Sequence, residues 1–276
     1  DVCSTLGYIA EMHNWCRPLI DNSKDFIIKD GRHSVVEKTI FKKSLNAFVP
    51  NDCSLSTNEH LWLITGPNMA GKSTFLRQNA HIIILAQIGS YVPAKQAKIG
   101  IASKLFSRIG ASDNISKGQS TFMVEMLETS NIIKNADDKS FIILDEIGRG
   151  TSTFDGLAIA WAIIEKVLRS NKSRTLFATH YHELTEIEKT NSKVRNVSCE
   201  IKEWNDEIIY SYKVVEGKSK GSLGIKVAEL AGFPGDVIVE AKALLGKLQT
   251  KGVSQEDIHL EEEDFEKERL IRIKNE

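Results

Sequence analysis

Eight residues of this chain have the types and spacing of a phosphate-binding loop. Residues 66–73 read Gly-Pro-Asn-Met-Ala-Gly-Lys-Ser, with the two glycines, the lysine and the serine at the required positions. In such a loop, backbone N–H groups surround a polyphosphate at the positive end of the helix that follows. Lys72 is then expected to contact the β- and γ-phosphates, and Ser73 to offer its hydroxyl to Mg²⁺. The alternative is a glycine-rich turn with a surface lysine.

The residues around this loop favour the phosphate-binding interpretation. An apolar run at 61–65 predicts a strand before the loop, and residues 72–88 have the apolar spacing of a helix after it. The alternation then continues, with strands expected at 104–109, 141–145 and 174–179 and helices expected at 121–136 and 156–170. This order predicts an α/β fold with a mainly parallel sheet flanked by helices.

Two adjacent carboxylates, Asp145 and Glu146, come at the end of the apolar strand 141–145. Open α/β sheets bind their ligands at the carboxyl ends of the strands. ATP hydrolysis needs one carboxylate that holds hydrated Mg²⁺ and a second that orients or deprotonates the attacking water. We therefore assign Asp145 to the metal and Glu146 to the water. The alternative is that both carboxylates only cap the strand end.

Two further side chains have positions suited to the γ-phosphate. His180 follows the strand 174–179, where an imidazole can donate a hydrogen bond to that phosphate; the alternative is a packed or solvated histidine. Ser120 or Thr121 is expected to cap the helix 121–136, and a side chain that acts only as an N-cap needs no ligand. A free helix N-terminus is also an anion site. Because the phosphate loop already occupies one side of a nucleotide, Ser120 is expected to face the nucleotide of another subunit.

The bulk composition is ordinary for a globular protein. The chain has 276 residues, of which 41% are hydrophobic, and a net charge of −1. Its four cysteines form no Cys-x-x-Cys pair, which indicates reduced thiols in an intracellular protein. No apolar stretch approaches the roughly 20 residues of a membrane span. Residues 256–276 carry a net charge of −5, which leaves +4 for the rest, so charge alone does not indicate a nucleic-acid surface.

The remaining segments have weaker patterns. Residues 1–20 have helical spacing up to Pro18 and no start methionine, which suggests a piece of a longer protein. Alternating apolar residues in 26–50 predict short strands, including 34–36 and 47–49. A hairpin is expected at 194–215, with its turn at Asn205 and Asp206, and it is followed by helices near 223–231 and 235–249.

Four segments together resemble the ATPase domain of the MutS mismatch-repair family. They are Gly-Pro-Asn-Met-Ala-Gly-Lys-Ser-Thr at 66–74, Ser-Thr-Phe-Met-Val-Glu-Met at 120–126, Asp-Glu-Ile-Gly-Arg-Gly-Thr-Ser-Thr-Phe-Asp-Gly at 145–156 and Ala-Thr-His-Tyr-His-Glu-Leu at 178–184. The resemblance spans about residues 26–245. It implies a P-loop ATPase of the ABC type, in which ATP and Mg²⁺ are held between two subunits and Ser120 acts in trans.

The resemblance also implies further nucleotide contacts. Phe48 lies where the family stacks an aromatic ring on adenine, and Tyr212 lies where a second ring can close on the base. As a strand residue, Phe48 could equally well pack in the core. The whole loop is expected to contact the nucleotide: Gly66, Pro67, Asn68, Met69, Ala70, Gly71, Lys72, Ser73 and Thr74.

On the same resemblance, the chain divides into four parts. Residues 1–22 end a helical core domain, 23–221 form the ATPase domain, 222–250 form a helix-turn-helix dimerisation extension, and 251–276 form an acidic, loosely ordered tail. The mismatch-reading parts are absent from this chain. The expected partners are a second subunit, identical or paralogous, mismatched double-stranded DNA through the missing parts, and a MutL-type protein, with no membrane. The expected location is the bacterial cytoplasm at the nucleoid, or the nucleus or an organelle in a eukaryote.

Two other functions remain open at this point. The nucleotide-binding subunit of a membrane transporter would share the sheet, the acidic pair and the histidine, but would need a Leu-Ser-Gly-Gly-type signature where this chain has Ser-Thr-Phe-Met. A structural dimerisation module that binds nucleotide without turnover is the second. Within the MutS resemblance, a recombination role is an alternative to repair, although residues 227–234 favour the bacterial repair branch.

Overall fold

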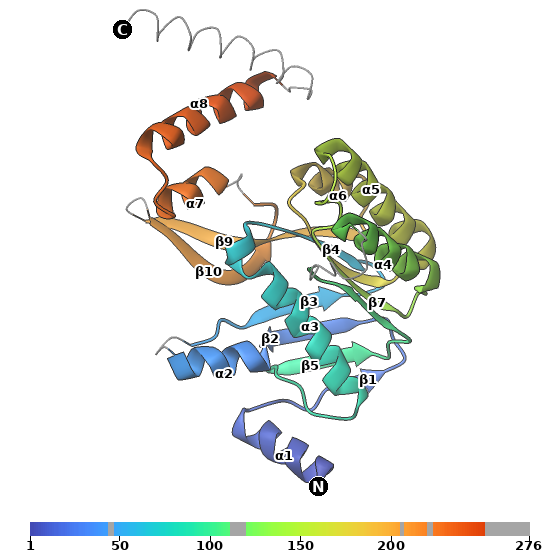
Figure 1. Ribbon diagram of the computed structural model, residues 1–276. Coiled ribbons are helices and arrows are strands. Elements are labelled where there is room, and N and C mark those ends of the chain that lie inside the picture. The colour runs from blue at the N-terminus through green and yellow to red at the C-terminus, as the bar shows by residue number, and fades with distance from the viewer. Residues whose placement is uncertain (44–46, 111–119, 205–206, 220–222, 252–276) are drawn as a thin grey trace, which may run out of the picture. The chain divides into compact units, whose positions relative to one another are not determined.

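The computed structural model describes residues 1–43, 47–110, 120–204, 207–219 and 223–251 (Figure 1). The chain divides into two compact units, Asp1–Gly221 and Ser222–Glu276. The turn expected at Asn205 and Asp206 and the acidic tail after Lys251 lie outside the described residues.

The first unit contains a six-stranded, mainly parallel sheet. Its strands are β4 (Leu61–Thr65), β6 (Leu105–Arg108), β7 (Phe141–Asp145), β8 (Arg174–Ala178), β9 (Val194–Trp204) and β10 (Glu207–Glu216), in the order β10-β9-β4-β8-β7-β6. Neighbouring strands from β9 to β6 pair in parallel, and only β10 pairs antiparallel, with β9. The mixed α/β fold with a parallel sheet and the hairpin at 194–215 are therefore confirmed.

Helices cover both faces of this sheet. Residues of α3 (Lys72–Gln87) pack in one core cluster with Phe141 and Leu176. Residues of α4 (Thr121–Asn135) and α5 (Thr153–Lys166) pack in another, with Ile142 and Leu144. Successive residues of β7 thus point to opposite cores, which explains why its sequence is continuously apolar. Beyond α5 the chain forms a π-helical segment (Val167–Asn171), a short 3₁₀ helix (His182–Glu186) and α6 (Ile187–Thr190).

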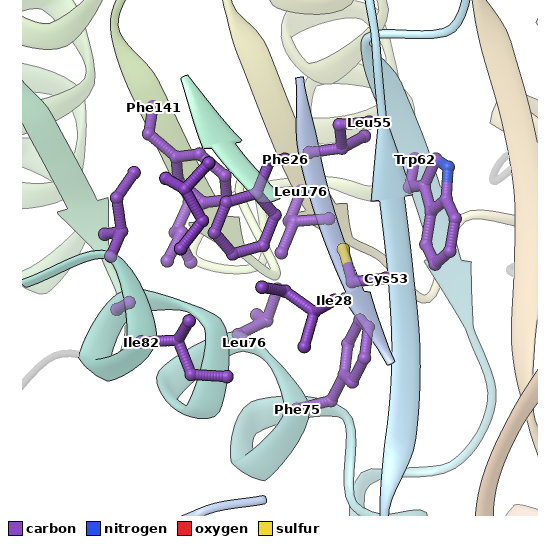
Figure 2. Packing of buried hydrophobic residues seen from close by; sticks show 14 of the residues in the cluster. Phe26, Ile28, Cys53, Leu55, Trp62, Phe75, Leu76, Ile82, Phe141 and Leu176 are labelled. Atoms are coloured by element: carbon purple, nitrogen blue, oxygen red, sulfur yellow. The ribbon is translucent and has the colours of Figure 1, made fainter. Parts of the chain in front are cut away.

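A second, four-stranded sheet was not expected from the sequence. It contains β1 (Leu19–Asp21), β2 (Phe26–Gly31), β3 (Asn51–Leu55) and β5 (Gln96–Gly100), in the order β1-β5-β2-β3. Figure 2 shows Phe26 and Ile28 of β2 facing Leu76 and Ile82 of α3. Because α3 packs against both sheets, the helix that begins at the glycine-rich loop is fixed from two sides.

Three local expectations were wrong. The first helix, α1 (Val2–Met12), ends well before Pro18, with Asn14 in a left-handed conformation (φ 51°). Residues 34–36 belong to a helix, α2 (Ser34–Lys43), instead of a strand, since the Glu37 N–H donates to His33 O. Residues 47–50 have no regular structure, so Phe48 is not a strand residue. The apolar runs in residues 26–50 are too short to distinguish the helical spacing of 3.6 residues from the alternation of a strand.

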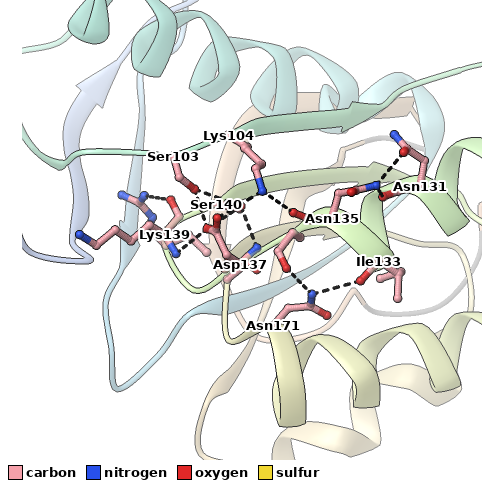
Figure 3. A network of polar contacts seen from close by, with 12 residues as sticks. Ser103, Lys104, Asn131, Ile133, Asn135, Asp137, Lys139, Ser140 and Asn171 are labelled. Atoms are coloured by element: carbon pink, nitrogen blue, oxygen red, sulfur yellow. Dashed lines mark hydrogen bonds and ion pairs between the residues drawn. The ribbon is translucent and has the colours of Figure 1, made fainter.

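A polar turn fixes the connection from α4 to β7. The Asp137 carboxylate accepts from Ser103 Oγ at 2.5 Å and from Ser140 Oγ at 2.9 Å (Figure 3). Asn171 donates to the carbonyls of Ile133 and Ala136. The hydrogen bond from Ser103 is the main cause that lowers the pKa of Asp137 to about 2. These contacts hold the start of β7, the strand that ends in Asp145.

In the second unit, the structure describes two helices. These are α7 (Gly224–Leu230) and α8 (Gly235–Lys251), and Glu229 of α7 lies 3.5 Å from the ammonium of Lys242 in α8. Exposed apolar side chains are frequent here, among them Leu230, Phe233 and Val239. Of the helices in the described ranges, none is long and apolar enough to cross a bilayer.

Candidate nucleotide site

The glycine-rich loop connects β4 to α3 and depends on two left-handed glycines. Gly66 has φ 123° and Gly71 has φ 100°, conformations that residues with a side chain rarely adopt. Between them, Asn68–Ala70 forms a single 3₁₀ turn. A Cβ at Gly71 would lie 3.3 Å from the Tyr212 ring. The predicted loop therefore has the expected strand before it and the expected helix after it.

Lys72 is buried at the start of α3, with 2% of its side chain exposed. Its ammonium donates to the carbonyl oxygen of Gly66 and lies 3.6 Å from Glu146 Oε1. A buried ammonium at a helix N-terminus is repelled by the positive end of the helix dipole. The same place is favourable for an anion, which both the ammonium and the dipole attract. The lysine of the loop and the water-assigned glutamate are thus brought together.

Ser73 and Asp145 also meet. Ser73 Oγ donates to Asp145 Oδ2 at 2.7 Å, while Asp145 Oδ1 is buried and has no hydrogen-bond partner among the described residues. Burial raises the pKa of Asp145 above its ordinary value, the hydrogen bond from Ser73 opposes this, and the Glu146 charge adds to it. A buried carboxylate oxygen without a partner is suited to a cation.

The oxygen atoms of Ser73 and Asp145 fit Mg²⁺, which prefers hard oxygen ligands. Within the described ranges, no group of three His, Cys, Asp or Glu side chains could hold a metal ion. Mg²⁺ usually takes one or two protein oxygens and completes its shell with water and phosphate, so it needs no such group.

Glu146 has a strained backbone held by strand contacts. Its φ is 53°, and its N–H donates to Ala178 O at 2.9 Å across the β7–β8 pair. Its side chain is 16% exposed, and its carboxylate lies between Lys72 and Arg149, whose Nη1 donates to Oε2 at 2.8 Å. Left-handed conformations of non-glycine residues often occur at functional sites. Glu146 is the first residue after β7, so the left-handed conformation turns the chain immediately at the end of that strand.

His180 lies just beyond β8, whose Ala178 pairs with Asp145. The imidazole is exposed and packs on the Tyr181 ring, with centroids 4.1 Å apart. Desolvation by the protein lowers the pKa of His180 below its ordinary value, an effect that the Glu146 charge opposes. The neutral imidazole therefore predominates at neutral pH and keeps one N–H as a donor.

Ser120 has the predicted place in the fold. It is the N-cap of α4, and its hydroxyl accepts from the Met123 N–H at 3.2 Å. The side chain is exposed, and this contact lies within its own helix. Of the two predicted caps, Ser120 is the N-cap and Thr121 is the first residue of the helix, whereas the action of Ser120 in trans stays a prediction.

Phe48 and Tyr212 line one cavity beside the loop. This cavity has a volume of about 810 Å³, within the usual range for small-molecule sites. Its wall includes Met69, Gly71, Ser73 and Thr74 of the predicted set. The two aromatic residues, which are 164 positions apart in the sequence, therefore line the same cavity.

Sequence reasoning missed the contacts that place Tyr212. The pairing of β9 and β10 shifts between Tyr210 and Val214, and Tyr212 sits in this bulge with φ 54°. Buried Asn51 of β3 donates to Tyr212 O at 2.9 Å and accepts from the Val214 N–H at 2.8 Å. A bulge of this kind redirects a side chain. No local pattern around Asn51 could have revealed a partner so far along the chain.

Sequence reasoning assigned no role to two other residues at the site. Arg149 pairs with Glu146, as described above. Gln78 of α3 lines the cavity, is 1% exposed, and has no hydrogen-bond partner for either amide atom within the described part of the chain.

These features define an α/β domain in which a glycine-rich loop faces a pair of carboxylates at a strand end. The family model described as MutS domain V matches residues 62–249, which contain the loop, the carboxylate pair, Ser120, His180 and Tyr212. The chain therefore belongs to the MutS family of mismatch repair proteins.

The curated relatives agree with this family. The chain is 51% identical over 251 residues to the DNA mismatch repair protein MutS of Ruegeria sp., covering 90% of this chain and 29% of that protein. It is 52% identical to the proteins of the same name from Orientia tsutsugamushi, over 92% of the chain and 28% of the relative, and from Clostridium tetani, over 96% and 31%. The chain thus spans less than a third of the length of these relatives.

Proposed function

We propose that this chain is the ATP-binding and ATP-hydrolysing domain of a MutS-like DNA mismatch repair protein, with the P-loop fold of the ABC type. The observation that carries the proposal is the approach of the loop to the strand-end acids. Lys72 Nζ lies 3.6 Å from Glu146 Oε1, and Ser73 Oγ lies 2.7 Å from Asp145 Oδ2. One triphosphate bound in the loop would therefore be within reach of all four side chains.

The chemistry follows from the environment of each group. The backbone N–H groups of residues 68–73 and the Lys72 ammonium bind the phosphates, which compete with Glu146 for that ammonium. The Glu146 oxygen that is released can then orient the attacking water and accept its proton. The neutral His180 donates to the γ-phosphate. Ser73 and Asp145 would hold Mg²⁺, which neutralises charge on the phosphates when it is bound.

Removal of the metal tests this proposal. We expect the purified chain to release phosphate from ATP with Mg²⁺ present and to lose at least about 90% of that activity with excess EDTA, since Mg²⁺ neutralises phosphate charge. Asp145→Asn should reduce the response to added Mg²⁺, because a charged ligand becomes a neutral one. The matched control is Asp138→Asn, which changes an exposed aspartate paired with Lys24. Phosphate release that is insensitive to EDTA would contradict the proposal.

The aromatic cavity gives a separate prediction about the base. Phe48→Ala should weaken ATP binding about 10-fold or more, because stacking of one base on an aromatic ring contributes about 1–3 kcal/mol. Binding of inorganic triphosphate should stay unchanged, since Phe48 is assigned to the base and not to the phosphates. Calorimetric titration measures both. Phe41→Ala is the control, because Phe41 is 85% exposed on α2; equal losses for ATP and triphosphate would remove Phe48 from the base site.

The wider role rests on the family. ATP binding would close two subunits, identical or paralogous, with Ser120 of each completing the other's site and α7 and α8 forming a helix-turn-helix dimerisation extension. The exposed apolar residues of these helices support such a contact. Mismatched DNA and a MutL-type protein would be bound by the full-length protein, in the bacterial cytoplasm at the nucleoid. The relatives' printed names and bacterial sources support this setting.

A further inference from the structure

The turn after Glu146 is held on both sides by buried side chains from other elements. The Gly148 N–H donates to Glu125 Oε1 of α4 at 2.6 Å, and the Gly148 carbonyl accepts from Tyr181 Oη at 2.9 Å. Glu125 is 8% exposed and Tyr181 is 4% exposed. We call these three residues, Glu125, Gly148 and Tyr181, the Gly148 clamp.

The position of Glu125 is itself fixed by charge. Arg108, at the end of β6, is 4% exposed and lies 3.5 Å from Glu125 Oε2. The same guanidinium lies 3.0 Å from Glu128, one turn further along α4. Because a buried carboxylate needs a partner, Glu125 has little freedom to leave Gly148.

Close packing also restricts the turn. Gly148 has φ 89°, and a Cβ there would lie 2.7 Å from the Cα of Gly156 in α5. A Cβ on Gly156 would lie 2.1 Å from the hydroxyl of Tyr181. Ile147, between Glu146 and Gly148, is fully buried. The backbone on the carboxyl side of Glu146 therefore has a single way to pack.

We infer that Glu125 and Tyr181 are positioning residues for ATP hydrolysis, which hold Gly148 so that Glu146 keeps its left-handed backbone and presents its carboxylate to the phosphate loop. Both side chains act through the turn, because each forms its hydrogen bond with the backbone of Gly148. This inference rests on the hydrolytic role proposed above for Glu146. Without the clamp, a glutamate at φ 53° would relax toward a right-handed or extended conformation, since that conformation is unfavourable for residues other than glycine.

Steady-state kinetics of three variants test the clamp. Tyr181→Phe keeps the ring and loses only the hydroxyl. It should lower kcat about 10-fold with little change in the KM for ATP, because a displaced Glu146 affects the hydrolysis step and not ATP binding. Glu125→Leu should lower kcat at least as much. Glu125→Gln should restore kcat to near the wild-type value, because its amide oxygen can still accept from Gly148. A merely structural role would not produce this rescue.

The control is Glu128→Leu, which removes the other carboxylate beside Arg108 and should leave kcat unchanged. Amide hydrogen exchange of the peptide containing residues 145–151 supplies a readout that needs no turnover. Exchange should be faster in Glu125→Leu and Tyr181→Phe, and close to wild type in Glu125→Gln and Glu128→Leu.

Unchanged exchange in both Glu125→Leu and Tyr181→Phe would overturn the clamp, as would a wild-type kcat in either variant or a rise in KM that accounts for the loss. A wild-type chain that releases no phosphate would instead contradict the proposed function. In that case the exchange comparison still decides whether the clamp holds the turn, so the two failures are distinguishable.

Discussion

Glu146→Gln should bind ATP in a lasting dimer and hydrolyse it at about one hundredth of the wild-type rate or less, the usual loss when a general base is removed. The amide has nearly the same shape as the carboxylate and can still lie between Lys72 and Arg149, but it cannot accept a proton from water. Phosphate release and size-exclusion chromatography with ATP and Mg²⁺ measure the two effects.

The matched control for this variant is Glu165→Gln. Glu165 also pairs with an arginine, Arg169, but on the surface of α5. Unchanged turnover in Glu146→Gln would remove Glu146 from its role. If the wild-type chain bound ATP and dimerised without releasing phosphate, the nucleotide-binding dimerisation module would be the better description.

Lys72→Ala should weaken ATP binding by about 10- to 100-fold, because hydrogen bonds to a charged group contribute about 1.5–3 kcal/mol. The loss should be larger for ATP than for ADP, since the lysine is expected at the β- and γ-phosphates. Equilibrium binding of a fluorescent ATP analogue, competed with ATP or ADP, measures both affinities.

Lys98→Ala is the control for Lys72→Ala, because Lys98 forms its ion pairs with Asp21 and Asp25 in the smaller sheet. A thermal unfolding curve should show that Lys72→Ala still folds, since the substitution removes a buried charge. Equal ATP affinities of wild type and Lys72→Ala would contradict the assignment of residues 66–73 as a phosphate-binding loop.

The parts of the site that sequence could predict are those defined by short, local patterns. The loop at 66–73, the acids at the end of β7 and the cap at Ser120 each depend on residues within one strand, one turn or one helix start. Local sequence also predicted the parallel sheet, because its strands are buried on both faces and read as continuous apolar runs.

The parts that it missed depend on contacts between distant segments. The smaller sheet contains short strands whose partners are far apart in the sequence, such as β1 and β5. The place of Tyr212 follows from a bulge and from Asn51, 161 residues away. The clamp on Gly148 joins three separate elements. No single window of the sequence contains any of these arrangements.

The cavity beside the loop is bounded by both sheets, so the two sheets contribute different parts of the candidate site. Tyr212 comes from β10 of the larger sheet, whereas Asn51 belongs to β3 of the smaller one, and Lys213 reaches across to the carbonyl of Pro50 at 2.6 Å. The groups assigned to the phosphates, in contrast, all follow strands of the larger sheet. On the proposed assignment, a slight shear between the two sheets would therefore change the affinity for the base, while the residues assigned to the phosphates would keep their positions relative to one another.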